Sequence, residues 1–212
     1  MIRLLRIKYY QFTEQWQKDG FFPACKYSLY RCEEAVPVEK DLSTLDALKP
    51  PPDSDDCSLA ELDGQSSCSV PFHYLLRSRK EKTVLNFQKG YCTFVLVKNN
   101  QAIADVWCTA GTTKPGGTTH PDLKRFAITL NPGECYLFDM FLSLTDRRKG
   151  MATFFVNSVL HALKNKGFKK VYGYFDAKNI PALWVHRLLG YKEMPRYVIK
   201  KVLLFETVKA KT

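Results

Sequence analysis

The sequence contains no run of about eighteen consecutive apolar residues, so it predicts no transmembrane helix. Near the start, Arg3, Arg6 and Lys8 interrupt the apolar residues, whereas a secretory signal needs an unbroken apolar stretch. The seven cysteines form no CxxC pair, show no zinc-ligand spacing and leave one over in any full pairing. We therefore expect reduced thiols in a cytoplasmic protein, most of them acting as small apolar side chains in the core, and we expect no metal site.

Neither of the common glycine-rich phosphate motifs, GxxxxGK[ST] and GxGxxG, is present. The chain also lacks the interleaved aromatic and basic residues of single-strand binders, and it has no recognisable recognition helix. We therefore do not expect nucleic acid as its partner, although its charge would attract one. No internal repeat is visible.

Positive charge is abundant and unevenly distributed. The formal net charge is +11 over 212 residues. Residues 33–63 hold ten carboxylates and two lysines, a net charge of −8, so the rest of the chain carries +19. Such a field attracts polyanions, which include nucleic acid, an anionic membrane surface and a phosphate-rich cofactor, and charge alone does not choose among them.

With 45% hydrophobic residues, the chain can bury a core of ordinary size. We predict a core domain over residues 70–212, with residues 1–69 packing on it or extending it as part of one structural unit. Residues 1–18 have the spacing of a basic amphipathic helix. Such a helix either lies on a membrane or packs on its own domain, and we expect the second.

The apolar periodicity and the turn residues predict most of the secondary structure. We predict helices at 1–18, 72–82, 149–166 and 179–190, and strands at 25–32, 91–98, 101–109, 135–142, 169–175 and 197–205. The acidic stretch, rich in serine, aspartate and proline, and the loop at 110–122 separate these elements, and we expect the acidic stretch to be mobile. The order predicts an α/β layer architecture, in which helices flank a mixed sheet.

The most informative position is the junction after the predicted central strand 135–142. A turn with three cations, Arg147, Arg148 and Lys149, precedes Gly150, which lets the backbone approach a ligand closely. The following helix then presents its free N–H groups and positive dipole end, which favours a diphosphate or triphosphate. The alternative is a solvated basic turn in which Gly150 serves packing, and the turn alone leaves both interpretations open.

Two motifs in their context resemble the GNAT superfamily of acyl-CoA-dependent N-acyltransferases. The basic turn resembles the family signature Q/R-x-x-G-x-G/A and here reads Arg147-x-x-Gly150-x-Ala152. A later segment resembles the family element N-x-x-A-x-x-x-Y-x-x-x-G-F and here reads Asn179-x-x-Ala182-x-x-x-His186-x-x-x-Gly190-Tyr191. The likeness covers roughly residues 70–205, and residues 1–69 match only loosely.

The resemblance implies the GNAT-like fold, which has a mixed, mainly antiparallel sheet with two splayed parallel strands. Here these strands would be 135–142 and 169–175, with acetyl-CoA or another acyl-CoA between them as the acyl donor. The resemblance places the donor-binding groups at the basic turn and on the two flanking segments. They are the backbone of Met140, Phe141 and Leu142 with Asn179 for the pantetheine arm, and Arg147, Arg148, Lys149, Gly150, Met151, Ala152 and Thr153 for the pyrophosphate.

The family reaction is direct attack of an amine on the thioester, so a base and a proton donor for the leaving thiolate are needed. His186 occupies the position where the family usually has the donor tyrosine; the alternative is a helix-surface histidine that fills space. Asp139 interrupts an apolar strand and is the first candidate for the base, with an ion pair to an arginine or lysine as the alternative. Glu134 is a weaker candidate, and the following strand could add Tyr172, Tyr174 and Asp176.

The sequence thus predicts an N-acyltransferase that moves an acetyl or longer acyl group to a primary amine. The acceptor would be a small molecule or a protein lysine or N-terminus. A binding module that holds acyl-CoA without turnover is the alternative, because the usual tyrosine is missing. The identity of the acceptor, the acyl chain length and the oligomeric state are left open.

Overall fold

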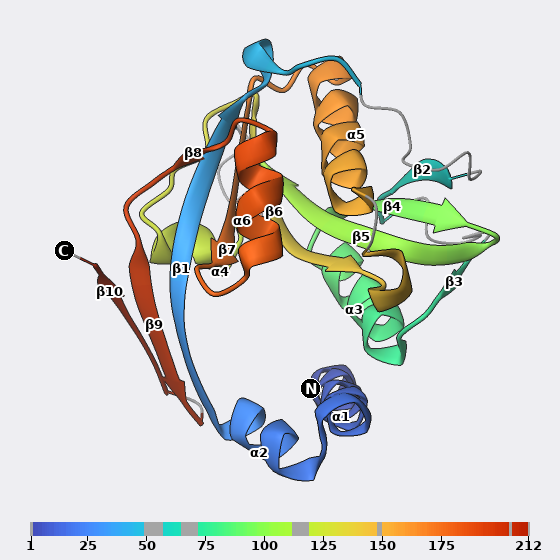
Figure 1. Cartoon of the computed structure of the whole chain (residues 1–212), viewed down its shortest axis with the longest axis vertical. Helices are drawn as coiled ribbons and strands as arrows, with labels where there is room; N and C mark the ends of the chain where they lie inside the picture. The colour runs from blue at the N-terminus through green and yellow to red at the C-terminus, as the bar shows by residue number, and fades with distance from the viewer. Residues whose placement is uncertain are drawn as a thin grey trace.

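The computed structural model describes residues 2–48, 57–64, 72–111, 119–147, 150–203 and 205–211 (Figure 1). The helices are α1 (Ile2–Asp19), α2 (Phe21–Leu29), α3 (Arg77–Gln88), α4 (Pro121–Arg125), α5 (Met151–Asn165) and α6 (Ile180–Leu188). The strands are β1 (Tyr30–Asp41), β2 (Cys57–Leu62), β3 (His73–Tyr74), β4 (Cys92–Lys98), β5 (Gln101–Ala110), β6 (Glu134–Leu142), β7 (Lys170–Asp176), β8 (Lys192–Glu193), β9 (Tyr197–Val202) and β10 (Phe205–Ala210). Two short 3-10 turns lie at Leu42–Thr44 and Leu144–Asp146.

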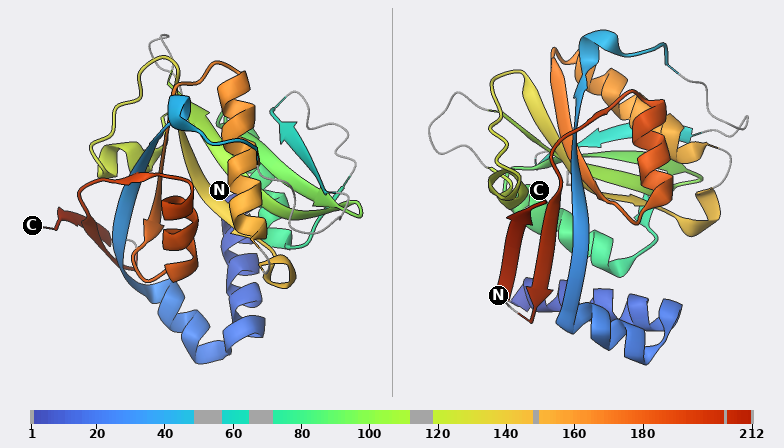
Figure 2. Two further views of the ribbon diagram at one scale, coloured as in Figure 1. Left: turned by 45° about the horizontal axis from the view of Figure 1, so that its top comes forward. Right: turned by 60° about the vertical axis from the view of Figure 1, so that its left-hand side comes forward.

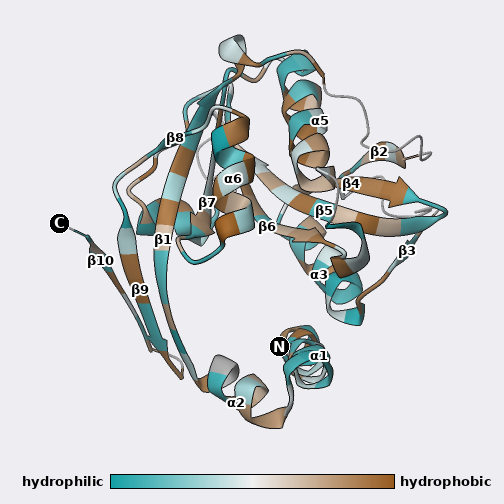
Figure 3. Cartoon of the chain, in the orientation of Figure 1, coloured by the Kyte–Doolittle hydropathy of each residue, from teal (hydrophilic) through white to brown (hydrophobic). Residues whose placement is uncertain are grey.

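The strands form one sheet in the order β10-β9-β1-β7-β6-β5-β4-β2, with β3 beside β5 and β8 beside β1. The pairing of β6 with β7 and the short pairing of β3 with β5 are parallel, and the other pairings are antiparallel. Helices flank this sheet, so the predicted fold class, a mixed and mainly antiparallel sheet, is confirmed. Apolar residues are concentrated along the central strands β4, β5 and β6 (Figure 3).

Each face of the sheet is covered by helices (Figures 1 and 2). On one face, α5 packs Phe155, Val159 and Leu163 into the largest apolar cluster, as the spacing of its residues predicts. On the other face, Leu123 of α4 and Phe126, which follows that helix, pack against aromatic side chains of the sheet. The first two helices, α1 and α2, lie at one end of the molecule, where α1 runs beside α3.

Several predicted elements are confirmed almost to the residue. The hairpin of β4 and β5 turns at Asn99 and Asn100, both in the left-handed region with φ of 50° and 58°. The predicted central strand is β6, the predicted helix after Gly150 is α5, and the predicted strand after it is β7. Asn179 caps α6 by accepting a hydrogen bond from the Ala182 amide at 3.2 Å.

The prediction for residues 25–32 is wrong in its placement. Helix α2 continues to Leu29, and the strand runs from Tyr30 through the acidic stretch to Asp41. The stretch that was expected to be mobile is therefore, in its first part, a strand between β7 and β9. Its apolar side chains, Val36 and Val38 among them, are buried.

The carboxylates of β1 are held by basic residues that are distant in the sequence. Glu34 pairs with Arg196 at 3.0 Å and with Lys211 at 2.7 Å, and Glu39 lies 3.6 Å from Lys170 and 3.5 Å from Lys192. A short stretch of sequence around β1 does not contain these partners. The many charged residues of this segment therefore indicated a loop, whereas the structure has a strand. In β1, the carboxylates of the acidic segment therefore pair with basic residues of this chain itself.

Other boundaries also shift. Helix α3 begins at Arg77 and not at residue 72, and the predicted strand 197–205 is β9 followed by a turn at Leu203 and the separate strand β10. The loop at 110–122 ends in the short helix α4. The thiols of Cys25, Cys32, Cys92, Cys108 and Cys135 form no disulfide, and the last two are buried, whereas Cys68 lies outside the described residues. None of the described helices combines the length and the apolarity that are needed to cross a bilayer.

We predict that Val38→Ala lowers the free energy of unfolding by about 2 kcal/mol, because it removes fully buried methyl groups from β1. Urea unfolding followed by circular dichroism measures this. The matched control is Val202→Ala on the neighbouring strand, whose side chain is 51% exposed, and which should change stability by less than about 0.5 kcal/mol. Equal effects of the two replacements would contradict the burial of β1.

Candidate functional site

The site is built where β6 and β7 stop pairing. The two parallel strands are hydrogen-bonded only from Glu134 opposite Lys170 to Tyr136 opposite Tyr172. Beyond these residues β6 stays paired with β5, and β7 stays paired with β1 on its other side. The two strands therefore separate, as was predicted for a pair of splayed strands (Figure 1).

A bulge in β6 lies just beyond this point. Asp139 has a φ of +51°, an uncommon conformation for a residue other than glycine, and the pairing with β5 shifts register opposite it. After the bulge, the Ser143 amide donates to the Ile103 carbonyl at 2.8 Å. Because backbone groups alternate along a strand, those of Met140 and Leu142 face away from β5 and towards the opening. One of them, the Leu142 carbonyl, accepts a hydrogen bond from Arg147 Nε at 3.1 Å.

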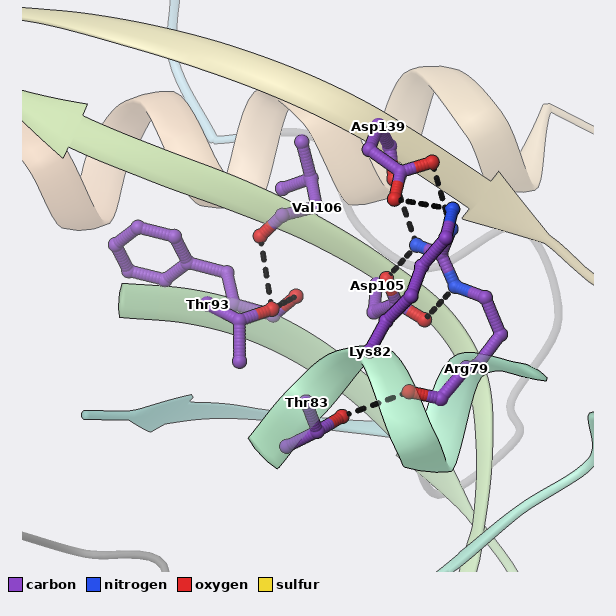
Figure 4. Close-up of polar contacts among 8 residues, drawn as sticks. Arg79, Lys82, Thr83, Thr93, Asp105, Val106 and Asp139 are labelled. Atoms are coloured by element: carbon purple, nitrogen blue, oxygen red, sulfur yellow. Dashed lines mark hydrogen bonds and ion pairs between the residues drawn. The ribbon is translucent and has the colours of Figure 1, made fainter. Parts of the chain in front are cut away.

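The bulge is held by Arg79 of α3, a guanidinium that is almost completely buried (Figure 4). It donates to both carboxylate oxygens of Asp105 on β5, with Nε at 3.0 Å from Oδ2. The same side chain donates from Nη1 to Asp139 Oδ1 at 2.8 Å and from Nη2 to the Asp139 carbonyl at 2.6 Å. One arginine therefore ties the helix to both strands and fixes the backbone at the bulge.

The second carboxylate oxygen of Asp139 is also occupied, because Lys82 of α3 donates to it at 2.8 Å. Burial acts to raise the pKa of Asp139, but the charges of Arg79 and Lys82 outweigh it and hold that pKa below the ordinary value. The ion-pair alternative is thus present in the structure. An ionised carboxylate with both oxygens bound and a lowered pKa is a weak base, and the role of Asp139 as the base stays a prediction that these contacts do not favour.

The start of α5 exposes backbone amides. Gly150 precedes the helix with a φ of +79°, and a Cβ added there would meet nothing within 4 Å. The first helical hydrogen bond runs from the Phe154 amide to the Gly150 carbonyl at 2.9 Å, so the amides of Met151, Ala152 and Thr153 have no acceptor within the helix. Among the described residues no side chain caps them. Such a helix start binds anions, and the predicted residues Arg148 and Lys149 of the same turn lie outside the described residues.

His186 lies on α6 with its Nδ1 at 2.7 Å from the Ala182 carbonyl. A carbonyl only accepts, so Nδ1 carries the hydrogen, and Nε2 of the neutral ring is an acceptor. The ring stacks on Phe175 with 5.0 Å between centroids and meets Tyr191 edge-on at 4.8 Å. Burial lowers the pKa of His186. This favours the neutral ring, so the predicted role as proton donor is not supported by these contacts and stays a prediction.

Glu134 is placed apart from the other candidates. Its carboxylate accepts hydrogen bonds from the Asn131 amide at 2.9 Å and from Asn131 Nδ2 at 3.2 Å, so it closes the turn before β6. It pairs with Lys170 where β6 and β7 are still together, whereas Asp139 lies after they separate. On β7, Tyr172 and Tyr174 pack in the aromatic cluster around Phe126.

No protein-family model and no curated protein matches this sequence. Solved structures do match its fold. A tandem GNAT protein from the clavulanic acid biosynthesis pathway has a TM-score of 0.56 at 14% identity, with 89% of this chain and 57% of that chain covered. The GCN5-related glucosamine N-acetyltransferase region of a fungal multi-domain GH3 β-N-acetylglucosaminidase has a TM-score of 0.55 at 14% identity, with 88% and 23% covered. A Drosophila protein has a TM-score of 0.52 at 9% identity, with 88% and 57% covered.

The fold is that of the GCN5-related N-acetyltransferases. The resemblance seen in the sequence is therefore confirmed for the fold. At these identities the comparisons carry the fold alone, and the chain spans little more than half of the longer tandem protein and less than a quarter of the fungal enzyme. We call the separated ends of β6 and β7, the bulge in β6 and the start of α5 together the splay site.

Arg79, Lys82 and Asp105 are not among the site residues predicted from the sequence. One signal was present, because Asp105 interrupts the apolar run of β5 as Asp139 interrupts β6, and a buried carboxylate requires a basic partner. The partner lies on α3, and nothing in the spacing of the chain indicates that this helix crosses both strands. Within the described residues, no three His, Cys, Asp or Glu side chains come together in a way that could hold a metal ion.

We predict that Arg79→Met lowers the free energy of unfolding by about 3–5 kcal/mol, since it leaves the buried carboxylate of Asp105 without its charge partner. Lys82→Met should cost less than about 1 kcal/mol, because Asp139 is partly exposed and keeps Arg79. Urea unfolding of both variants measures the difference.

The double variant Arg79→Met with Asp105→Leu is the control. It removes both buried charges together and should recover most of the lost stability. If Arg79→Met is no more destabilising than Lys82→Met, the guanidinium does not hold the bulge.

Proposed function

We propose that this protein transfers an acyl group from acyl-CoA to a primary amine. The observation that carries the proposal is the end of parallel pairing at Tyr136 and Tyr172, from which β6 continues to an uncapped helix start. A thioester with a long polar arm and a diphosphate fits such a surface, because the strand edge offers amide and carbonyl groups and the helix start offers amides.

In this proposal the pantetheine arm pairs with the backbone of Met140 and Leu142, which faces the opening. The pyrophosphate binds the free amides from Gly150 to Thr153 at the start of α5. Arg147 spans the two parts, because its side chain already bonds the Leu142 carbonyl. An amide of β6 beside the thioester carbonyl would polarise it as an oxyanion hole does. Phe141, Arg148, Lys149 and Asn179 stay predictions of the family resemblance, and Asn179 caps α6 with its side chain.

In the reaction the amine nitrogen attacks the thioester carbon, the C–S bond breaks and the CoA thiolate leaves, while the amine loses a proton. We assign the acceptance of that proton, directly or through water, to Nε2 of His186, because the neutral ring offers a lone pair there. Arg79 acts as a positioning residue, since it fixes the bulge that turns the following backbone groups towards the donor.

An acyl-CoA-binding module without turnover is the second candidate. The occupied carboxylate of Asp139 and the histidine in place of the family tyrosine favour it. The two candidates differ in a direct experiment, in which the protein is mixed with acetyl-CoA and a panel of primary amines and free thiol is followed. Thiol release that depends on the amine supports the transferase, whereas calorimetric binding of CoA without thiol release supports the module.

We predict that Gly150→Val weakens CoA binding about tenfold or more, because a β-branched side chain covers amides that each form a charge-assisted bond of about 1.5–3 kcal/mol. Isothermal titration with CoA measures the affinity. Gly167→Val at the other end of α5 is the matched control, since that glycine also has a positive φ, +85°, and open space around it.

Both variants carry the same backbone strain, so both should lose similar stability, and only the first should lose affinity. Unchanged CoA affinity in Gly150→Val would remove the start of α5 from the donor site.

We predict that His186→Phe lowers kcat about a hundredfold and leaves CoA affinity near its original value, as expected when a proton-transfer group is lost. In the unchanged protein kcat should rise with pH through the lowered pKa of His186, because only the neutral ring accepts a proton. The variant should lose this step in its pH profile.

The control is His161→Phe, which also replaces a histidine within a helix, here α5. In the unchanged protein, Nε2 of His161 lies 2.9 Å from the Asp46 carbonyl. A kcat that falls as the pH rises through this range would instead restore the donor role.

A further inference from the structure

Helix α1 packs on its own domain through its polar side. Glu14 accepts hydrogen bonds from the amide and the hydroxyl of Ser78 at the start of α3, and Arg3 lies 3.5 Å from Glu81. Ile7, on the same side of the helix, is its one buried residue. An amphipathic helix on a domain ordinarily turns its apolar stripe inward, so this orientation is inverted.

The apolar stripe of α1 therefore faces away from α3. It follows helical spacing through Ile2, Leu5, Tyr9, Phe12 and Trp16. Apart from Phe12, which is partly buried, these side chains are exposed, from 49% for Trp16 to 72% for Ile2. Contiguous exposed apolar side chains of this size mark an interaction surface.

The stripe continues across the corner into α2 through aromatic contacts. The ring centroids of Phe12 and Trp16 are 6.2 Å apart, those of Trp16 and Phe21 are 5.4 Å apart, and those of Phe21 and Phe22 are 5.9 Å apart. Phe22 is 84% exposed. We call this surface the aromatic stripe, formed by Ile2, Leu5, Tyr9, Phe12, Trp16, Phe21 and Phe22.

Basic residues border the aromatic stripe. At about 100° per residue, the exposed Arg6 and Lys8 lie on opposite sides of it. The acidic residues of α1 are engaged elsewhere, since Glu14 faces α3 and Asp19 accepts a hydrogen bond from Gln15. The surface thus combines large apolar side chains with a rim of positive charge.

A second apolar projection lies at the same end of the molecule (Figure 2). The turn between β9 and β10 is tied to the end of α2 by a hydrogen bond from the Leu203 amide to the Leu29 carbonyl at 2.7 Å. Val202, Leu203 and Phe205 of this turn are exposed, Phe205 by 80%. It follows the basic residues Lys200 and Lys201.

We propose that the aromatic stripe docks the protein on an anionic phospholipid surface, where α1 lies in the plane of the interface. The apolar side chains enter the boundary between headgroups and acyl chains, and Arg6 and Lys8 meet the anionic headgroups. A second copy of this chain fits less well, because a two-fold contact would bring the same basic rims together. This surface is separate from the splay site, and the proposal does not depend on acyl transfer.

The experiment uses the full chain and vesicles of phosphatidylcholine, alone or mixed with phosphatidylserine, with binding followed by cosedimentation. Binding to the mixed vesicles should exceed binding to phosphatidylcholine alone and should weaken with salt. Leu5→Glu combined with Phe22→Glu should lower the affinity for mixed vesicles about tenfold or more. Leu188→Glu is the matched control, because Leu188 on α6 is similarly exposed, at 58%, and should leave binding unchanged.

A spectroscopic readout locates the contact. In a Trp184→Phe background the remaining tryptophans are the buried Trp107 and the exposed Trp16, so a shift of emission to shorter wavelength on vesicles reports Trp16. Circular dichroism of each variant verifies that the fold is retained. The proposal is overturned if mixed vesicles do not bind the protein or if Trp16 emission does not move. It is also overturned if the protein forms dimers that Leu5→Glu with Phe22→Glu dissociates, since the stripe then serves a second copy.

Discussion

The architecture depends on a limit to the pairing of β6 with β7. Each of the two strands also pairs with a second neighbour, β5 for β6 and β1 for β7. After Tyr136 and Tyr172, β6 and β7 keep only these second neighbours and separate from each other. Hydrogen-bonding groups of β6 are thereby left facing an opening in the middle of the sheet, between β6 and β7. If β6 and β7 paired along their whole length, β6 would have no unpaired edge in the middle of the sheet.

The bulge of β6 beside this opening is held by ion pairs of α3. Arg79 reaches both strands of the β5–β6 pair, bonds the backbone carbonyl of Asp139 and is neutralised by the two carboxylates. The same contacts hold the pKa of Asp139 below its ordinary value. Asp139, which the sequence singled out, thus shapes the bulge of β6, and its role as the base stays a prediction.

Local patterns were sufficient for several elements in the middle of the chain. The hairpin at Asn99 and Asn100, the strand β6 and the helix after Gly150 each carry a complete signal within a few residues, so their prediction needed no tertiary information. Strand β1 does not carry such a local signal, because its carboxylates are neutralised by Arg196, Lys211 and other residues that are distant in the sequence. The donor-site residues that the family resemblance names stay predictions. The contacts of Arg79 and the partners of Asp139 could not be predicted from local patterns. Those depend on which helix crosses which strand.

The position of β1 also bears on how the chain acquires its structure. This strand is made early, yet both of its neighbours, β7 and β9, come from the last third of the sequence. During synthesis the two edges of β1 stay unpaired until β7 and β9 have left the ribosome. Contacts between such remote segments slow folding, and the unpaired edges of β1 are exposed to association until those contacts form.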